Sequence, residues 1–113
     1  MPAKRNPLGL NKLQLRTLAL LQELAALIGE PLEGEPGAVT VAQFPPAHGD
    51  HFHMGDYVVR GADATGLGNE AVWVALTRKG LARSSFPVSI VLTPAGLAYD
   101  TGVRDQVLHP GGH

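Results

Sequence analysis

Residues 62–82 have the sequence ADATGLGNEAVWVALTRKGLA, in which a glycine-containing turn separates two segments suited to helices. Ala62 is small enough to let one helix pack closely on another, and residues 65–68 (TGLG) turn the chain. The apolar stripe of the second segment consists of Val72, Ala75 and Leu76. The pattern predicts a helix-turn-helix, a motif typical of nucleic-acid binding.

The second helix of this motif is expected from Glu70 to Lys79. Asn69 is suited to cap it, because a short polar side chain accepts hydrogen bonds from the free N–H groups of a first turn. Glu70 in the first turn and Arg78 with Lys79 in the last turn suit the helix dipole, and Gly80 ends the helix.

The first helix of the motif is predicted over residues 57–65, whose sequence is ambiguous. Val58 and Val59 favour a strand, whereas the alanine-rich end of the segment favours a helix. We prefer the helix because Asp56 can cap its start. Gly66 can end it, because helices often end at a glycine in the left-handed αL conformation.

A β-hairpin and a short helix are expected next. Residues 81–84 and 87–92 favour strands and flank a turn. Thr93-Pro94 is typical of a helix start, with proline at the first helical position. The chain after Gly102 has no periodicity, so residues 103–113 are expected to form a C-terminal tail.

The most regular helix of the sequence is predicted over residues 10–28. Asn11 can cap it, and its leucines spread over more than one face. A single core-facing stripe needs fewer leucines, so the surplus predicts the seam of a homodimer or contact with the rest of a larger fold. The preceding residues 1–9 are expected to form a flexible N-terminal arm.

An acidic insertion rich in proline and glycine is predicted at residues 29–50. Residues 30–37 are expected to form a loop, because their prolines and glycines oppose regular structure. Residues 39–44 and 48–54 alternate like two short extended segments, with Pro45-Pro46 between them.

Two runs carry a family resemblance: LTRKGLA at 76–82 and, after the hairpin, LTPAG at 92–96. Together they resemble bacterial winged-helix regulators, especially the multiple-antibiotic-resistance (MarR-like) type, whose recognition helix runs into Leu-x-x-x-Gly-Leu and whose wing ends in Leu-Thr-x-x-Gly. The resemblance covers about residues 57–98. It implies a small α+β winged-helix domain over residues 10–102, with a helix, an extended segment, a helix-turn-helix, a hairpin wing and a short C-terminal helix.

The resemblance also implies which side chains meet double-stranded DNA. On the recognition helix and the wing these are Asn69, Glu70, Trp73, Thr77, Arg78, Lys79, Arg83, Ser84 and Ser85. The phosphate contacts would come from Arg78, Lys79 and Arg83, joined by Arg60 and by Lys4 and Arg5 of the arm. Trp73 has an alternative role, because a tryptophan at this position can instead cover the edge of the core.

The charge of the chain keeps a second function open. The formal net charge is −1 at pH 7, so DNA binding needs a local basic face or a dimer. Residues 23–70 contain a single basic residue, Arg60. The same stretch contains eight acidic residues: Glu23, Glu30, Glu33, Glu35, Asp50, Asp56, Asp63 and Glu70. We expect a dimeric DNA-binding transcriptional regulator, and a winged-helix protein-association module without DNA binding is the alternative.

A histidine cluster gives a minor hypothesis, a metal-responsive regulator. In an extended strand His51 and His53 point the same way with Cα atoms roughly 6.6 Å apart. This spacing can clasp a zinc or nickel ion, with His48 or Asp50 completing the ligand set. The alternative is that these side chains only solvate a polar loop.

Catalysis is not expected. The sequence has no cysteine, which excludes disulfides and thiolate sites. Its serines lack the surroundings of a nucleophile and its carboxylates are scattered, so we predict no enzyme, no catalytic residue and no organic cofactor. The sequence contains no recognisable signal peptide or bilayer-spanning run, and a cytoplasmic location is therefore expected.

Overall fold

Helix α1 (Lys12–Ile28) begins where side chains close its first turn. In the computed structural model, which describes residues 6–46 and 49–111, the Gln14 N–H donates to the Asn11 side chain and the Asn11 N–H donates to the Gln14 side chain. This capping box satisfies two N–H groups that a helix start otherwise leaves unpaired. The predicted helix over residues 10–28 is confirmed, except that it begins two residues later.

Short elements surround α1. The strands are β1 (Glu30–Pro31), β2 (Val39–Val41), β3 (His51–Met54), β4 (Tyr57–Arg60), β5 (Ala82–Ser85), β6 (Ser89–Leu92) and β7 (His109–Pro110). The helices are the 3-10 helices η1 (Gly61–Asp63) and η2 (Thr65–Gly68) and the α-helices α2 (Glu70–Arg78), α3 (Pro94–Ala98) and α4 (Arg104–Val107). The expected α+β class is confirmed.

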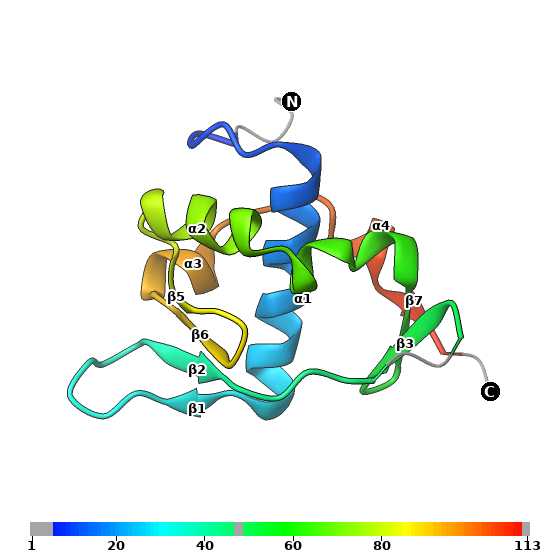
Figure 1. The fold of residues 1–113 in the computed structure, drawn as a ribbon, viewed down its shortest axis with the longest axis horizontal. Helices are drawn as coiled ribbons and strands as arrows, with labels where there is room; N and C mark the ends of the chain where they lie inside the picture. Colours follow the sequence, from blue (N-terminus) through cyan, green and yellow to red (C-terminus); the bar gives the residue numbers. More distant parts are fainter. Residues whose placement is uncertain (1–5, 47–48, 112–113) are drawn as a thin grey trace.

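The strands form two antiparallel sheets, and Figure 1 shows them on either side of α1. The larger sheet has the order β1-β2-β6-β5, so that β2 pairs with the second strand of the β5–β6 hairpin. The smaller sheet has the order β3-β4-β7, in which a strand from near the C-terminus joins the β3–β4 hairpin.

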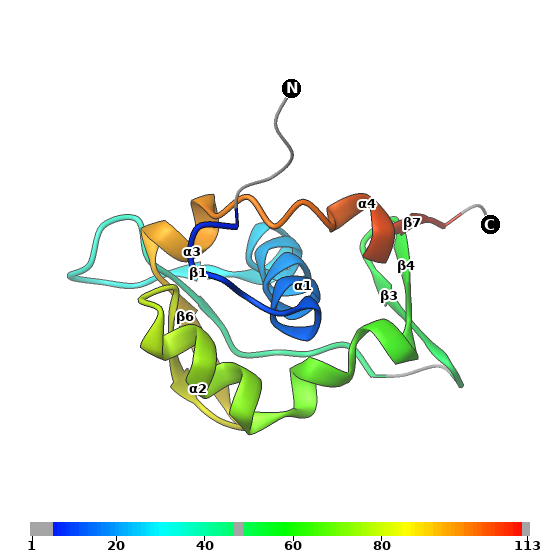
Figure 2. The same cartoon turned by 90° about the horizontal axis from the view of Figure 1, so that it is seen from above.

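The middle of α1 is buried on every side. The consecutive residues from Thr17 to Leu21 are each at most 1% exposed, and consecutive helical residues point in directions about 100° apart. Figure 2 looks along α1 and shows α2 on one side of it and the chain through α3 and α4 on the other. The leucines beyond one stripe therefore pack within this chain, and in the last turn Leu27 and Ile28 are 44% and 42% exposed.

Aromatic side chains extend the core from α2 toward the hairpin. Trp73 is 1% exposed. Its ring centroid lies 5.7 Å from that of Phe44, which follows β2, and 4.8 Å from that of Phe86, which lies in the β5–β6 turn. The Trp73–Phe86 contact is edge to face, an arrangement that aromatic pairs favour.

The predicted first helix of the helix-turn-helix, residues 57–65, is wrong. Its first four residues form β4, and η1 and η2 follow. Met54 pairs with Tyr57, so Gly55 and Asp56 form a two-residue hairpin turn and Asp56 caps no helix. Gly55 has a φ of 59°, which glycine adopts without strain, and the two valines then favour the extended chain.

Gly66 serves a different purpose from the predicted left-handed stop. Its φ is not positive, but a Cβ at this position would overlap the Thr17 hydroxyl on α1. The Thr17 hydroxyl itself donates to the Leu13 carbonyl at 2.8 Å, so it is held in place. Glycine therefore lets η2 lie directly against α1.

The predicted C-terminal tail is wrong for residues 104–110. Helix α4 packs on α1, and β7 pairs with β4. Val107 and Leu108 are 0% and 4% exposed, so this segment belongs to the core.

Residues 1–9 were predicted to form a flexible arm, but the described part of this segment, residues 6–9, is hydrogen-bonded to the domain. The Leu8 N–H donates to the Tyr99 hydroxyl at 3.1 Å, and that hydroxyl donates to Asn6. Residues 1–5, with Lys4 and Arg5, lie outside the described residues.

The remaining predicted elements are found with small changes. The β5–β6 hairpin and α3 are confirmed, and the Thr93 hydroxyl caps α3 by accepting from the Gly96 N–H at 3.1 Å. Strands β2 and β3 lie within the two predicted extended segments. The predicted loop at 30–37 begins with β1, which pairs with β2.

The Gly66 contact predicts that Gly66→Ala destabilises the fold. The new methyl group must push α1 and η2 apart, which typically costs about 1–3 kcal/mol in a packed core. The free energy of unfolding from urea titrations measures the effect.

Gly68→Ala is the matched control, because nothing lies within 4 Å of a Cβ there and the φ of Gly68 is not positive. We expect it to stabilise the fold by about 0.4–1 kcal/mol, through the lower entropy of the unfolded chain. Equal stability of the two variants would contradict the close packing of η2 on α1.

Candidate nucleic-acid interface

Helix α2 has the ends that the sequence predicts. The Asn69 side chain accepts from the Ala71 N–H at 3.0 Å and caps the helix. Glu70 lies in the first turn and Arg78 in the last, and Asn69, Glu70, Arg78 and Lys79 are all exposed. The helix therefore presents polar groups at both ends, and between them its outer side carries Ala71, Val74 and Ala75.

The prediction that Trp73 contacts DNA is wrong. Its side chain is 1% exposed and packs between Phe44 and Phe86, so a base or sugar cannot reach it. The alternative role at the edge of the core is the one the structure shows. The Trp73 indole Nε1 is buried and has no hydrogen-bond partner among the described residues.

The hydroxyl groups of Thr77 and Ser84 form hydrogen bonds with backbone groups of this chain. The Thr77 hydroxyl donates to the Trp73 carbonyl at 2.9 Å, and the Ser84 hydroxyl accepts from the Phe86 N–H at 3.2 Å. Both residues are half-buried, whereas Ser85 is exposed. Of these three, Ser85 presents the most open side chain to a ligand.

Arg83 on the hairpin is paired with an acidic side chain of the predicted insertion. Its two terminal nitrogens donate to the two carboxylate oxygens of Glu35 at 2.6 and 2.5 Å. This hydrogen bond raises the pKa of Arg83 and lowers the pKa of Glu35. Arg83 was predicted to contact a DNA phosphate, but its positive charge is balanced by the Glu35 carboxylate. The same ion pair joins the turn between β1 and β2 to the hairpin.

Arg60, at the end of β4, is exposed and forms no ion pair with any residue in the described ranges. Arg78 and Lys79 likewise form none. They lie at the C-terminal end of α2, where their charge also suits the helix dipole.

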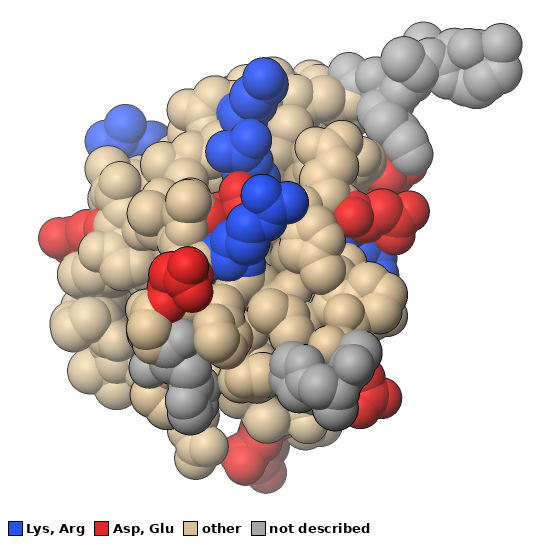
Figure 3. Space-filling view, turned by 90° about the vertical axis from the view of Figure 1, so that its right-hand side faces the viewer, with Lys and Arg blue, Asp and Glu red and all other residues tan. Residues whose placement is uncertain are grey.

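Sequence reasoning missed an ion pair between the buried Glu23 of α1 and the half-exposed Arg104 of α4. Arg104 donates to Glu23 with an Nη1–Oε1 distance of 2.7 Å, and its guanidinium lies 5.5 Å from the centre of the Tyr57 ring. The hydrogen bond to Glu23 raises the pKa of Arg104. Figure 3 faces the side of the molecule that carries α4 and shows Lys and Arg side chains following one another in a row.

The two described histidines of the predicted metal site lie together. The rings of His51 and His53 are 4.9 Å apart, centre to centre, and meet edge to face. His51 Nδ1 lies 3.4 Å from an Asp50 carboxylate oxygen. Residues 6–46 and 49–111 contain no group of three His, Cys, Asp or Glu placed to hold a metal ion. His48 lies outside the described residues, and the metal site stays a prediction.

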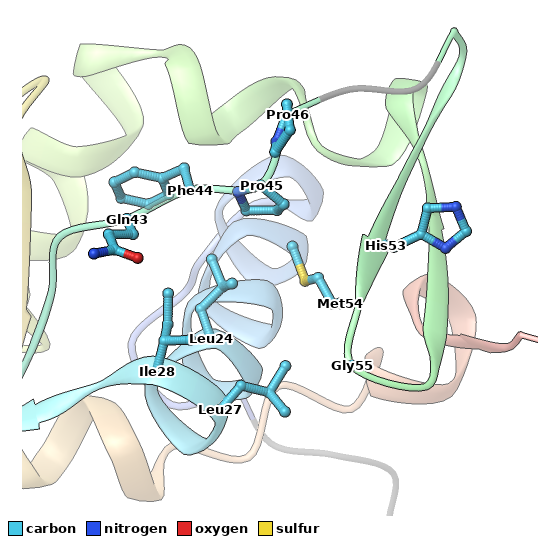
Figure 4. A pocket seen from close by; sticks show the side chains of 10 residues that line it. All are labelled: Leu24, Leu27, Ile28, Gln43, Phe44, Pro45, Pro46, His53, Met54 and Gly55. Carbon is cyan, nitrogen blue, oxygen red and sulfur yellow. The ribbon is translucent and has the colours of Figure 1, made fainter.

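An apolar groove of about 430 Å³ lies between the end of α1, residues 43–46 and the β3–β4 turn. Leu24 and Met54 are 3% and 1% exposed and form its floor, while Leu27 and Ile28 are largely exposed. Figure 4 shows Met54 pointing from β3 toward α1 and His53 pointing away from the groove.

Comparison of the chain with protein-family models, curated proteins and solved structures finds no match. Among the described residues, no helix combines the length and apolar character needed to cross a membrane.

The pair on the hairpin predicts that Arg83→Gln raises the pKa of Glu35 toward its ordinary value. An NMR pH titration of the Glu35 side chain measures this shift, and Arg78→Gln, which removes an unpaired arginine, is the control. Because the folded pKa of Glu35 is lowered, any stabilisation by the pair is present above the unfolded pKa and is lost as the pH falls through the folded pKa. An unchanged pKa in Arg83→Gln would show that the two side chains are not paired in solution.

Proposed function

We propose that the chain is a DNA-binding transcriptional regulator of the winged-helix type, with α2 as its recognition helix and the β5–β6 hairpin as its wing. Part of the order of elements supports this: α1 and strand β2 come first, α2 follows after the β3–β4 hairpin, and then come the β5–β6 hairpin, which pairs with β2, and the short helix α3. Two 3-10 helices take the place of the first helix of the pair. They still lead the chain directly into the cap of α2.

The observation that carries the proposal is the pair of unpaired cations at the end of α2. Arg78 and Lys79 are exposed and directly precede the hairpin. Asn69 and Glu70 add hydrogen-bonding groups at the other end of the helix. Two phosphate contacts contribute about 1.8 to the slope of log affinity against log salt, and a dimer doubles this contribution.

This proposal predicts that Arg78→Gln/Lys79→Gln weakens binding to duplex DNA. Fluorescence anisotropy with a labelled random-sequence duplex, measured over a range of salt concentrations, gives the slope. We expect the unmodified chain to weaken linearly in the log-log plot and the double variant to lose about 1.8 of the slope per protomer.

Arg83→Gln is the matched control on the hairpin. Glu35 already balances the Arg83 charge, so this single substitution should reduce the slope by less than half of the double variant's loss. If the unmodified chain does not bind duplex DNA even at low salt, the regulator function is wrong.

A second candidate function is a winged-helix protein-association module without DNA binding, for which a second copy of this chain is one partner. One observation favours it: Leu27 and Ile28 at the end of α1 are exposed beside the apolar groove. Leucines of α1 nearer the middle, such as Leu20 and Leu21, are 0% exposed, so a homodimer through this helix would have to use its last turn.

Sedimentation velocity over a range of concentrations tests this association. Ile28→Lys places a cation at a helix C-terminus, which the dipole favours, so it removes the apolar contact without opposing the helix. We expect the unmodified chain to dimerise and Ile28→Lys to be monomeric. Val88→Lys, at a residue that is 70% exposed in the hairpin turn, is the control and should still dimerise. A chain that is monomeric at all concentrations contradicts the second candidate.

A further inference from the structure

A row of basic side chains follows one stripe of α1 and continues onto α4. Lys12, Arg16 and Glu23 lie within about 40° of one another around the helix. Between Arg16 and Glu23 this stripe is buried, with Ala19 1% exposed, and the half-exposed Arg104 of α4 covers its far end by its hydrogen bond to Glu23. We call Lys12, Arg16 and Arg104 the α1 basic row. Figure 3 shows the side of the molecule that carries α4, where several Lys and Arg side chains lie one above another and acidic side chains lie beside the lower ones.

The positive charge of the row comes from Lys12 and Arg16. Neither forms an ion pair with a described residue, and residues 6–22 contain no acidic side chain. Glu23 balances the charge of Arg104. A guanidinium has five N–H donors, however, so Arg104 can still donate to a further oxygen while Glu23 holds it in place.

These two cations are placed where they weaken α1. Lys12 is its first residue, at the end where the helix dipole disfavours positive charge, and the first turn has no acidic residue. Arg16 follows one turn later, and like charges at this spacing repel. Stability alone therefore does not account for this arrangement, which is the pattern expected where a residue serves a ligand.

The length of the row selects the class of ligand. Lys12 and Arg16 are about 6 Å apart along the helix axis, and the row extends about 16 Å from Lys12 to the level of Glu23. A single phosphate group cannot span this length. A duplex carries a phosphate every 3.4 Å or so along each strand, so one strand can meet the whole row.

We propose that the α1 basic row is a second contact surface for the phosphate backbone of DNA, separate from α2 and the hairpin. This inference rests on the proposed DNA-binding function and names a surface for it. The row contacts phosphates only, so it adds affinity without sequence preference.

Salt-dependent binding of the full chain to a labelled random-sequence duplex tests the inference, with Lys12→Gln/Arg16→Gln as the row variant. We expect this variant to lose about 1.8 of the salt slope. Its urea unfolding midpoint should equal or exceed that of the unmodified chain, because the substitutions remove repulsion from α1. Weaker binding together with undiminished stability is the result that a merely structural role would not give.

Ala42→Asp/Ala95→Asp is the matched control, because it changes the net charge by the same amount at exposed positions outside α2, the hairpin and the α1 basic row. It should keep the slope of the unmodified chain. If the unmodified chain binds the duplex and the row variant keeps the full slope, the row is not a contact surface, while the proposed function stands. If the control loses as much slope as the row variant, net charge and not position is responsible, and the inference is wrong. If the unmodified chain does not bind the duplex, the proposed function fails and this inference fails with it.

Discussion

The burial of α1 on all of its sides is the constraint on which the rest of the structure depends. The other helices have nine residues or fewer, and helices of that length are marginal in water. The hairpins are two short strands each, which are equally marginal alone. Each of these elements is stable because it covers part of α1 or of a neighbour that does. The relative position of α2 and the hairpin is set both by their packing on α1 and by their direct contact, in which Trp73 meets Phe86.

Ion pairs change the electrostatic character of the surface more than the composition indicates. Glu35 balances Arg83 on the hairpin, and Glu23 balances Arg104 beside α1. In both cases the acidic partner comes from a distant part of the chain. Among the described residues, the unpaired cations are then Lys12 and Arg16 at the start of α1, Arg78 and Lys79 at the end of α2, and Arg60 at the end of β4. A formal net charge of −1 does not reveal these positions.

The sequence was sufficient for elements whose signals are local. Asn11, Asn69 and Thr93 each marked a helix start, and each makes the capping hydrogen bond in the structure. The hairpin at 82–92 was likewise recognisable from its two strand-forming runs and the turn between them.

The elements that were mispredicted depend on distant partners. Strand β4 pairs with β7 near the C-terminus, and β7 and α4 are too short to show a periodic pattern. The Gly55-Asp56 pair was a usable hairpin signal, because glycine followed by aspartate is common in two-residue turns. Lys12 and Arg16, one turn apart on a predicted helix, could also have been noticed in the sequence. The pairing of Arg83 with Glu35, 48 residues away, could not, because nothing local to either residue indicates it.

The position of Trp73 gives the molecule an internal optical probe. It is the single tryptophan of the chain, and its indole touches Phe44, which lines the groove, and Phe86, which lies at the tip of the hairpin. The ultraviolet emission of the unlabelled protein therefore originates at the point where these two regions meet. A rearrangement of either region changes the surroundings of the same fluorophore, so both can be followed in native material without attaching a dye.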